Sequence, residues 1–295
     1  YAKALHYWAK ALTSENLKSF VKPYHFRPNG TKVGIIMAGN IPLVGFHDLL
    51  AVILSGKIAV CKVSSDDAYV IPQLLEDLYA INPVYQQQIL LVDKVKQVDA
   101  VIATGSNNSF RYFEYYFRDI PSVLRKNRKS MAVLGESTSE EDLKLLAEDI
   151  FTYYGLGCRN VSLVFKPKNL PIEQVIDNFS AYQHYLDHNK YSNNYTYQKA
   201  IALMNGENHW DAGYVLVKQE RSLNAPLACI NICNYSDIEQ VQAFITDHSS
   251  DIQCISTSLD LPQAVELGKT QTPALSDFAD NVDTMKFLEN LTQEA

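Results

Sequence analysis

Short apolar runs that alternate with helical patterns constrain the fold of this chain more than any other sequence feature. The runs VGIIMAGN, IAVCKVSS and VDAVIATGS are nearly continuous in apolar residues and end in small or polar ones. Helical periodicity separates such runs, as in residues 46–56 and 66–81. Because near-continuous apolar strands are typical of parallel sheets covered on both faces, the alternation predicts an α/β fold.

The same alternation runs through the second half of the chain. Residues 140–155 have helical periodicity and lead to Cys158, and NVSLVFKP follows as a strand. Further helices are predicted over 4–20, 171–186, 236–248 and 261–270, with Ser236 as the cap of the third. A chain of 295 residues can build a large core, and we expect one α/β unit with two lobes that join near 134–150.

Composition excludes several classes of protein. Lys and Arg number 26 against 33 Asp and Glu, for a formal net charge of −7, so the chain has no electrostatic footprint for nucleic acid. The most apolar run, LLAVILSG, is too short to span a membrane. The five cysteines are sparse and odd in number, which indicates reduced thiols and a cytoplasmic protein.

One cysteine stands apart from the others. The stretch YYGLGCRNVS places Cys158 behind Gly155 and Gly157, between a helical pattern and a strand. Glycines permit a tight turn and the close approach of a ligand, and a backbone N–H at such a turn can donate to an oxyanion. A thiol presented there can act as a nucleophile. A buried cysteine at a helix-to-strand corner explains the local sequence equally well.

Polar residues follow three of the predicted strands. Asn40 ends the first, Lys62 ends the second, and Gly105 and Ser106 lie in the loop ATGSNN. Open α/β sheets bind ligands at the carboxyl ends of their strands, and the N–H groups that begin a helix suit a phosphate. Turn and cap roles are the simpler explanation for each residue taken alone. No spacing of histidine, cysteine or carboxylate indicates a metal site.

Four stretches stand in compatible order and spacing, namely VGIIMAGNIPLVGFHDLLAVILSGKIAVCKVSS, ATGSNNSFRYFEYYF, SMAVLGE and YYGLGCRNVS. Together they resemble the aldehyde dehydrogenase superfamily, in its acyl-CoA reductase branch. The first resembles the superfamily's strand, Asn-Pro, helix, strand and Lys-Pro-Ser-Glu pattern. The others resemble its Phe-Thr-Gly-Ser loop, its Glu-Leu-Gly-Gly stretch and its Asn-x-Gly-Gln-x-Cys motif. The likeness extends from residue 33 to residue 290 and is greatest to the long-chain fatty acyl-CoA reductases of bacterial luminescence.

The resemblance implies two doubly wound α/β lobes with a cofactor and active-site cleft between them. The nucleotide-binding lobe is expected over residues 1–134 and the catalytic lobe over 135–275. A C-terminal tail, 276–295, is expected to pack back or to reach a neighbouring subunit of a homo-oligomer. Because the chain begins at Tyr1 in a helix-like stretch without an initiator methionine, we expect an N-terminal segment to be missing.

The resemblance also assigns site residues, position by position. Cys158 matches the nucleophile, and Asn40 matches the side-chain amide that forms the oxyanion hole together with the Cys158 backbone N–H. Lys62 matches the lysine that holds the adenosine ribose of the cofactor. Gly105 and Ser106 match the turn beside the cofactor pyrophosphate.

Two departures from the superfamily pattern bear on the chemistry. Val133 stands where hydrolytic members have a glutamate that activates water, so the resemblance favours acyl exchange with CoA over hydrolysis. Glu136 lies close by and is an alternative base. After the strand-end lysine, the usual Pro-Ser-Glu reads Val63-Ser64-Ser65. Loss of that carboxylate removes repulsion toward a 2′-phosphate, so we expect NADPH in preference to NADH, held in part by the two serines.

The resemblance therefore implies NADPH-dependent reduction of a long-chain acyl-CoA, or of an acyl group carried on a protein, to an aldehyde. A thioacyl intermediate forms on Cys158 in this reaction, and an acyl-protein synthetase is an expected partner. Two alternatives stay open. One is an acyl-phosphate reductase of the same superfamily, and the other is an inactive relative that binds acyl groups or acts as a scaffold.

Overall fold

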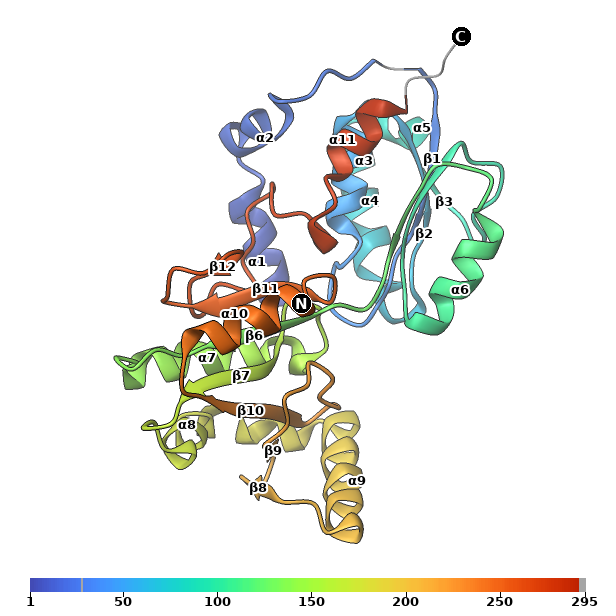
Figure 1. The fold of residues 1–295 in the computed structure, drawn as a ribbon. Helices are drawn as coiled ribbons and strands as arrows, with labels where there is room; N and C mark the ends of the chain where they lie inside the picture. The colour runs from blue at the N-terminus through green and yellow to red at the C-terminus, as the bar shows by residue number, and fades with distance from the viewer. Residues whose placement is uncertain (28, 292–295) are drawn as a thin grey trace. The chain divides into compact units, whose positions relative to one another are not determined.

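The computed structural model describes residues 1–27 and 29–291, and Figure 1 colours them along the chain. The chain forms two compact units. Unit 1 comprises Tyr1–Asn127 and the described residues from Ala274 onward, and unit 2 comprises Arg128–Pro273. The boundary lies at Asn127, whereas the sequence placed it after residue 134, because the strand that follows pairs within the sheet of unit 2.

Unit 1 is built on a parallel sheet with the strand order β3-β2-β1-β4-β5. Its strands are β1 (Lys32–Ile36), β2 (Ile58–Lys62), β3 (Ile89–Leu91), β4 (Ala100–Thr104) and β5 (Ser122–Arg125). The connecting helices are α3 (Phe46–Leu54), α4 (Val70–Ile81), α5 (Tyr85–Gln88) and α6 (Asn107–Tyr116), with 3₁₀ turns at Ser65–Asp67 and Ala279–Asn281. In Figure 1, α3 and α4 lie on one face of this sheet and α6 lies on the other. The strand order reverses between β1 and β4, the point where open α/β sheets bind ligands.

The N-terminal residues form two helices, α1 (Ala2–Ala11) and α2 (Ser14–Val21), instead of the single helix expected over 4–20. Thr13 starts the second helix because its side chain accepts a hydrogen bond from the Asn16 N–H at 3.2 Å. A local side-chain cap therefore interrupts a periodicity that by itself predicts one continuous helix.

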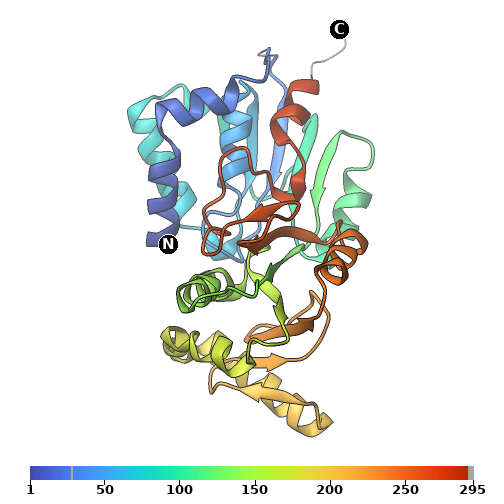
Figure 2. The ribbon, with the colours of Figure 1, turned by 60° about the vertical axis from the view of Figure 1, so that its left-hand side comes forward.

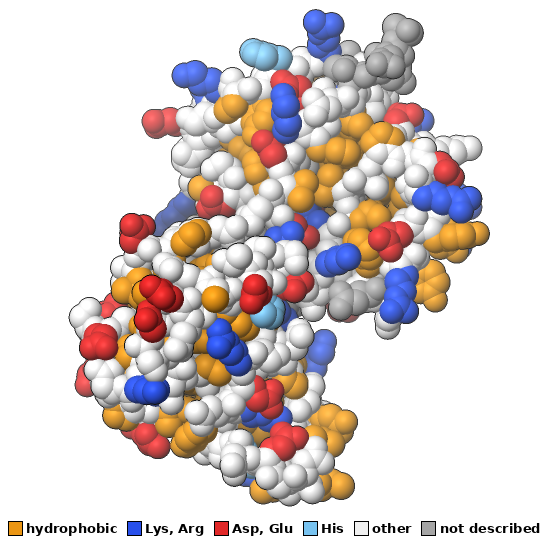
Figure 3. All heavy atoms as spheres, viewed as in Figure 1, with side chains coloured by type: hydrophobic (Ala, Val, Ile, Leu, Met, Phe, Trp, Pro, Cys, Tyr) orange, Lys and Arg blue, Asp and Glu red, His pale blue; other side chains and the backbone are white. Residues whose placement is uncertain are grey.

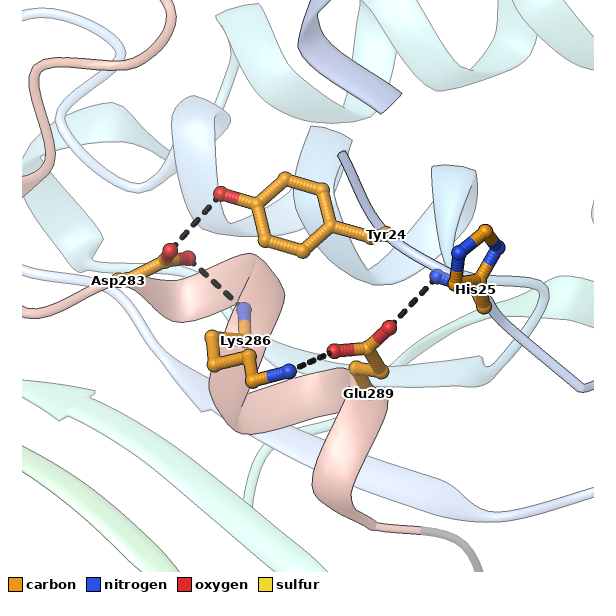
Figure 4. Close-up of polar contacts among 5 residues, drawn as sticks. All are labelled: Tyr24, His25, Asp283, Lys286 and Glu289. Atoms are coloured by element: carbon orange, nitrogen blue, oxygen red, sulfur yellow. Dashed lines mark hydrogen bonds and ion pairs between the residues drawn. The ribbon is translucent and has the colours of Figure 1, made fainter. Parts of the chain in front are cut away.

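The helix α11 (Thr284–Asn290) ties the C-terminal segment to unit 1, as Figure 4 shows. The Tyr24 hydroxyl donates to the Asp283 carboxylate at 2.8 Å, and the His25 backbone N–H donates to Glu289 at 2.6 Å. Asp283 also caps the helix. Figure 1 and Figure 2 both draw α11 alongside α3. The described part of the C-terminal tail, up to residue 291, thus packs back on the N-terminal segment of unit 1.

Unit 2 is built on a second sheet, with the strand order β12-β11-β6-β7-β10-β9-β8. Its strands are β6 (Lys129–Val133), β7 (Val161–Pro167), β8 (His209–Asp211), β9 (Leu216–Lys218), β10 (Cys229–Tyr235), β11 (Ile252–Thr257) and β12 (Ala264–Val265). Its helices are α7 (Glu140–Phe151), α8 (Ile172–Asp177), α9 (Asn189–Asn205) and α10 (Ile238–Asp247), with 3₁₀ turns at Thr152–Gly155 and Ser180–Asp187. The neighbouring strands run parallel, apart from β8, which is antiparallel to β9.

Apolar side chains cover both faces of this second sheet. Leu143 and Leu146 of α7 pack with Val164 of β7 on one face. Phe244 of α10 packs with Phe165 of β7 on the other face, and their ring centroids lie 5.2 Å apart. Adjacent residues of one strand thus serve opposite faces, as the two-residue period of a strand requires. The α/β fold with covered parallel sheets, predicted from the near-continuous apolar strands, is confirmed.

Two local predictions in unit 2 are wrong. Residues 261–270 contain the strand β12 instead of a helix, and β12 pairs in parallel with β11. Pairing at the open edge of the sheet outweighs a short helical periodicity, because strand formation depends on the neighbouring strand. The helix α10 is capped by Asp237 instead of Ser236, since the Asp237 side chain accepts the Glu239 N–H at 3.0 Å.

The surface carries charged side chains of both signs. Figure 3 shows lysine and arginine interspersed with aspartate and glutamate over both units. In the part of the chain that the structure describes, no helix is both long enough and apolar enough to cross a membrane.

Candidate active site

Three of the five cysteines are buried, whereas Cys158 and Cys229 are partly exposed. Cys61, Cys233 and Cys254 are buried in the sheets, and burial raises the pKa of each thiol, to about 12 for Cys61. Burial also raises the pKa of Cys229 to about 11. Because the thiolate is the nucleophile, these raised pKa values make all four thiols poor nucleophiles at neutral pH. Cys158 is partly exposed in a loop and is the candidate nucleophile.

Cys158 follows a sharp turn of the backbone. After α7, residues Tyr153, Tyr154 and Gly155 have φ angles of 56°, 60° and 74°, all in the left-handed region. That conformation is unfavourable for tyrosine, and such residues cluster at functional sites. The tight turn that the glycines predict is present, and two tyrosines share its left-handed conformation with Gly155.

Strand β6 contacts the Cys158 loop from the side. The Ser130 hydroxyl donates to the Cys158 carbonyl oxygen at 3.0 Å, and its oxygen lies 3.2 Å from the Cys254 sulfur. Burial lowers the pKa of the neighbouring Lys129, and the negative charge of the Cys158 thiolate opposes that shift. An ammonium group within electrostatic range stabilises a thiolate. The sequence marks neither Lys129 nor Ser130, because their relation to Cys158 arises only when β6 pairs with β7.

In unit 1, the predicted oxyanion donor Asn40 and the predicted cofactor residue Lys62 lie at the carboxyl ends of the adjacent strands β1 and β2. Lys62 is the last residue of β2, and its carbonyl oxygen accepts the Met37 N–H, just after β1, at 3.0 Å. Gly39 lies directly against the next loop, since a Cβ there would come 2.3 Å from the Ser64 hydroxyl oxygen. Asn40 and Lys62 are exposed. The parallel pairing therefore brings the Asn40 and Lys62 loops together.

The loop after β4 presents the N-terminus of a helix. Ser106 caps α6, because its hydroxyl oxygen accepts the Ser109 N–H at 3.3 Å. A Cβ on Gly105 would come 2.9 Å from both the Phe113 ring and the Ser109 Cβ, so a larger residue requires displacement of one of them. The partial positive charge at the start of α6 favours an anion.

Asp67, for which the sequence indicates no catalytic role, links two of these loops. It is 2% exposed, and its carboxylate accepts the Leu43 N–H at 3.1 Å. Its own N–H donates to the Ser64 carbonyl oxygen at 3.1 Å. Asp67 therefore holds the segment after Asn40 against the turn that begins at Ser65, which is itself exposed.

Val133 and Glu136, the two positions considered for a general base, lie at the end of β6 and just after it. Val133 is the last residue of the strand and is fully buried in the core of unit 2. Glu136 is exposed and accepts a hydrogen bond from the Asn169 side chain at 3.4 Å. The valine side chain cannot accept a proton from water. The absence of a general base, and the alternative role of Glu136, therefore stay predictions from the resemblance.

The predicted site residues fall in both units. Unit 2 carries Cys158. Unit 1 carries the others, namely Asn40, Lys62, Ser64, Ser65, Gly105 and Ser106. Across residues 1–27 and 29–291, no group of three or more His, Cys, Asp or Glu side chains is placed to hold a metal ion.

Solved structures of aldehyde dehydrogenases share this fold. The enzyme from Mycobacterium tuberculosis, in complex with NAD⁺, matches with a TM-score of 0.62 at 14% identity over 88% of this chain and 68% of its own. A mutant of aldehyde dehydrogenase C from Pseudomonas syringae, with NAD⁺ and octanal, matches with a TM-score of 0.62 at 12% identity over 88% and 64%. An NAD-dependent aldehyde dehydrogenase from Sinorhizobium meliloti has a TM-score of 0.62 at 13% identity over 84% and 56%. The chain thus spans 56% to 68% of the length of these proteins.

The sequence itself carries the family assignment. None of the curated proteins compared matches it. The family model described as Acyl-CoA reductase (LuxC) matches residues 17–269, a span that includes Asn40, Lys62 and Cys158. The resemblance drawn from the four sequence stretches is confirmed by this match and by the aldehyde dehydrogenase fold. The chain belongs to the LuxC family of acyl-CoA reductases.

Proposed function

We propose that this protein reduces long-chain acyl-CoA to the aldehyde with NADPH, through a thioester on Cys158. The observation that carries the proposal is the setting of Cys158, which is partly exposed beside a left-handed turn and lies near the Lys129 ammonium. Cys61, Cys233 and Cys254 are buried, and burial raises the pKa of Cys229 to about 11. Family membership supports acyl-CoA as the substrate class.

The first step is an acyl transfer to sulfur. The Cys158 thiolate attacks the acyl carbonyl carbon, the bond from that carbon to the CoA sulfur breaks, and CoA leaves as a thiolate. In the second step the acyl carbon gains a hydride, which a bound NADPH would supply, and the bond from that carbon to the Cys158 sulfur breaks. The aldehyde is released, and the Cys158 thiolate is restored. The same chemistry accepts an acyl group from an acyl-protein synthetase, because the attack needs only an activated acyl group with a good leaving group.

Asn40 is the proposed donor to the oxygen that becomes negatively charged in both steps. Its side-chain amide is exposed at the carboxyl end of β1. An oxyanion donor of this kind contributes ~2.7–4 kcal/mol to the transition state. The Cys158 backbone N–H is the proposed second donor.

The residues at the strand ends of unit 1 fit a dinucleotide. Lys62 offers an ammonium for the adenosine ribose, and the capped start of α6 at Ser106 offers backbone N–H groups for the pyrophosphate. The position of Gly105, packed against Phe113, leaves no side chain in the way of a phosphate. Bound NADPH supplies the hydride that the acyl carbon receives. Ser64 and Ser65, in place of a carboxylate, support NADPH over NADH.

Intact-protein mass after brief incubation with a long-chain acyl-CoA, without nucleotide, tests the proposal. We expect one acyl adduct on the wild type and on the control variant Cys229→Ala, and none on Cys158→Ala. Addition of NADPH should discharge the adduct as free aldehyde, and NADH should do so more slowly. An adduct that persists on Cys158→Ala would refute the assignment of the nucleophile.

The same assay separates the remaining functions. An adduct that forms from an acyl phosphate and not from acyl-CoA would identify an acyl-phosphate reductase. An adduct that forms but is not discharged by either nucleotide would identify an acyl-binding protein without reductase activity.

A further inference from the structure

The Asn160 side chain makes four hydrogen bonds around the loop that carries the proposed nucleophile. The helix α7 ends just before this loop, and the last carbonyl oxygens of a helix have no partner within it. The Asn160 side-chain nitrogen lies 3.1, 3.0 and 2.8 Å from the carbonyl oxygens of Asp149, Ile150 and Thr152. Asn160 thus caps α7 from outside, a role that a left-handed glycine commonly fills.

The oxygen of the same amide restrains the residue before the nucleophile. It accepts the Gly157 N–H at 2.8 Å, and the Asn160 N–H donates to the Gly157 carbonyl oxygen at 3.2 Å. Asn160 is 2% exposed, so water does not compete for these bonds. With carbonyl oxygens on one side and an N–H on the other, the partners define the orientation of the amide. The restraint therefore acts directly next to Cys158.

Asn160 is in turn anchored to the sheet of unit 2. Its carbonyl oxygen accepts the Ser130 N–H at 3.4 Å, and the next residue, Val161, starts β7 opposite Ser130. The Ser130 hydroxyl also donates to the Cys158 carbonyl oxygen. Asn160 consequently connects a fixed strand to the end of α7 and to Thr152 and Gly157, which flank the left-handed turn at 153–155.

We propose that Asn160 is a positioning residue that holds the left-handed turn at 153–155 and so places the Cys158 sulfur for attack on the acyl group. The inference rests on the proposed function for the identity of the group attacked. The turn needs external hydrogen bonds, because tyrosine does not favour a left-handed conformation. When the amide is removed, the turn relaxes and the sulfur loses its fixed position.

The chemistry of the contacts accounts for asparagine at this position. Three acceptors and one donor surround the side chain, and an amide supplies both donors and an acceptor on one short stem. Aspartate keeps the acceptor for Gly157 but places a carboxylate against three carbonyl oxygens. Alanine removes all four contacts.

The test compares Asn160→Ala and Asn160→Asp with two control variants of unit 2. Val175→Ala truncates a side chain that is 0% exposed in α8, and Asn178→Ala removes one exposed amide contact, to the Gln174 carbonyl oxygen at 2.9 Å. For each full-length variant, four quantities are measured. They are the acylation rate with a long-chain acyl-CoA, the affinity for NADPH, the rate of alkylation by iodoacetamide, and hydrogen exchange over 152–160.

We expect both Asn160 variants to be acylated about 10- to 100-fold more slowly, because a small misplacement of a reacting group has this effect. NADPH affinity should not change, since the cofactor residues lie in unit 1. Alkylation of Cys158 should stay the same or rise, because a small reagent needs access and not alignment. Exchange over 153–157 should be faster. Both controls should keep the wild-type acylation rate. We expect this even if Val175→Ala lowers the melting temperature as much as Asn160→Ala does.

Two results would overturn the proposal. One is acylation of Asn160→Ala within about threefold of the wild type, and the other is an equal loss of acylation in Val175→Ala, which would make the effect one of stability. If the wild type accepts no acyl group, the proposed function fails by itself. Hydrogen exchange and alkylation then still decide the role of Asn160, since an unchanged exchange pattern in both variants would refute it.

Discussion

Selective alkylation follows directly from the environments of the thiols. We expect brief treatment of the folded protein with iodoacetamide near neutral pH to modify Cys158 and to spare the other cysteines. Cys158 is partly exposed in its loop, whereas Cys61 is 0% exposed. Burial raises the pKa of Cys61 to about 12 and that of Cys229 to about 11.

The size of the effect follows from these pKa values. An ordinary thiol has a pKa of about 8.5, so at about pH 7.5 Cys229 and Cys61 hold roughly 300-fold and 3,000-fold less thiolate than a free thiol. More basic thiolates attack faster, which leaves a rate deficit of roughly 25-fold for Cys229 and 80-fold for Cys61. The lack of access slows Cys61 further. As pH rises toward 11, the thiolate fraction of Cys229 and hence its reactivity should increase.

Peptide mass mapping after timed alkylation measures each rate, with glutathione as the free-thiol reference. The same reaction in concentrated urea is the control and should label all five cysteines. Modification of Cys61 or Cys229 in the folded protein as fast as that of Cys158 would refute the argument from burial.

Three further changes have defined outcomes. Asn40→Ala should lower turnover about 100-fold or more through loss of an oxyanion donor, with an unchanged circular dichroism spectrum; turnover within a few-fold of the wild type would remove Asn40 from the mechanism. Gly105→Ala places a Cβ 2.9 Å from the Phe113 ring and should weaken NADPH binding about tenfold or more, equivalent to ~1.4 kcal/mol; unchanged affinity by titration would mean that the turn does not meet the cofactor. Asp48→Ala breaks the buried ion pair with Arg125, where the two residues are 3% and 4% exposed, and should lower the free energy of unfolding by ~3–5 kcal/mol; urea denaturation showing a loss below ~1 kcal/mol would contradict this.

The order of residues alone predicts the fold class, which the structure confirms, and marks Cys158 as the candidate nucleophile. Apolar runs of strand length that alternate with helical periodicity predict a parallel sheet covered on both faces. The strands β1, β2 and β4 form in the runs where they were predicted. The sequence also predicts the tight turn before Cys158, because Gly155 lies within that turn. These features depend on neighbours within a few residues, so the order of residues is sufficient to reveal them.

The surroundings of that cysteine and the boundary between the units arise from contacts between segments that are distant in sequence. Lys129 and Ser130 come near Cys158 because β6 pairs with β7, and Asp67 joins two loops that α3 and β2 separate along the chain. Asn160 is close in sequence, yet its role became visible only with the path of the chain after α7. The edge strand β12 replaced a predicted helix for the same reason. Each of these contacts is made between segments that folding brings together, and local periodicity carries no information about such pairings.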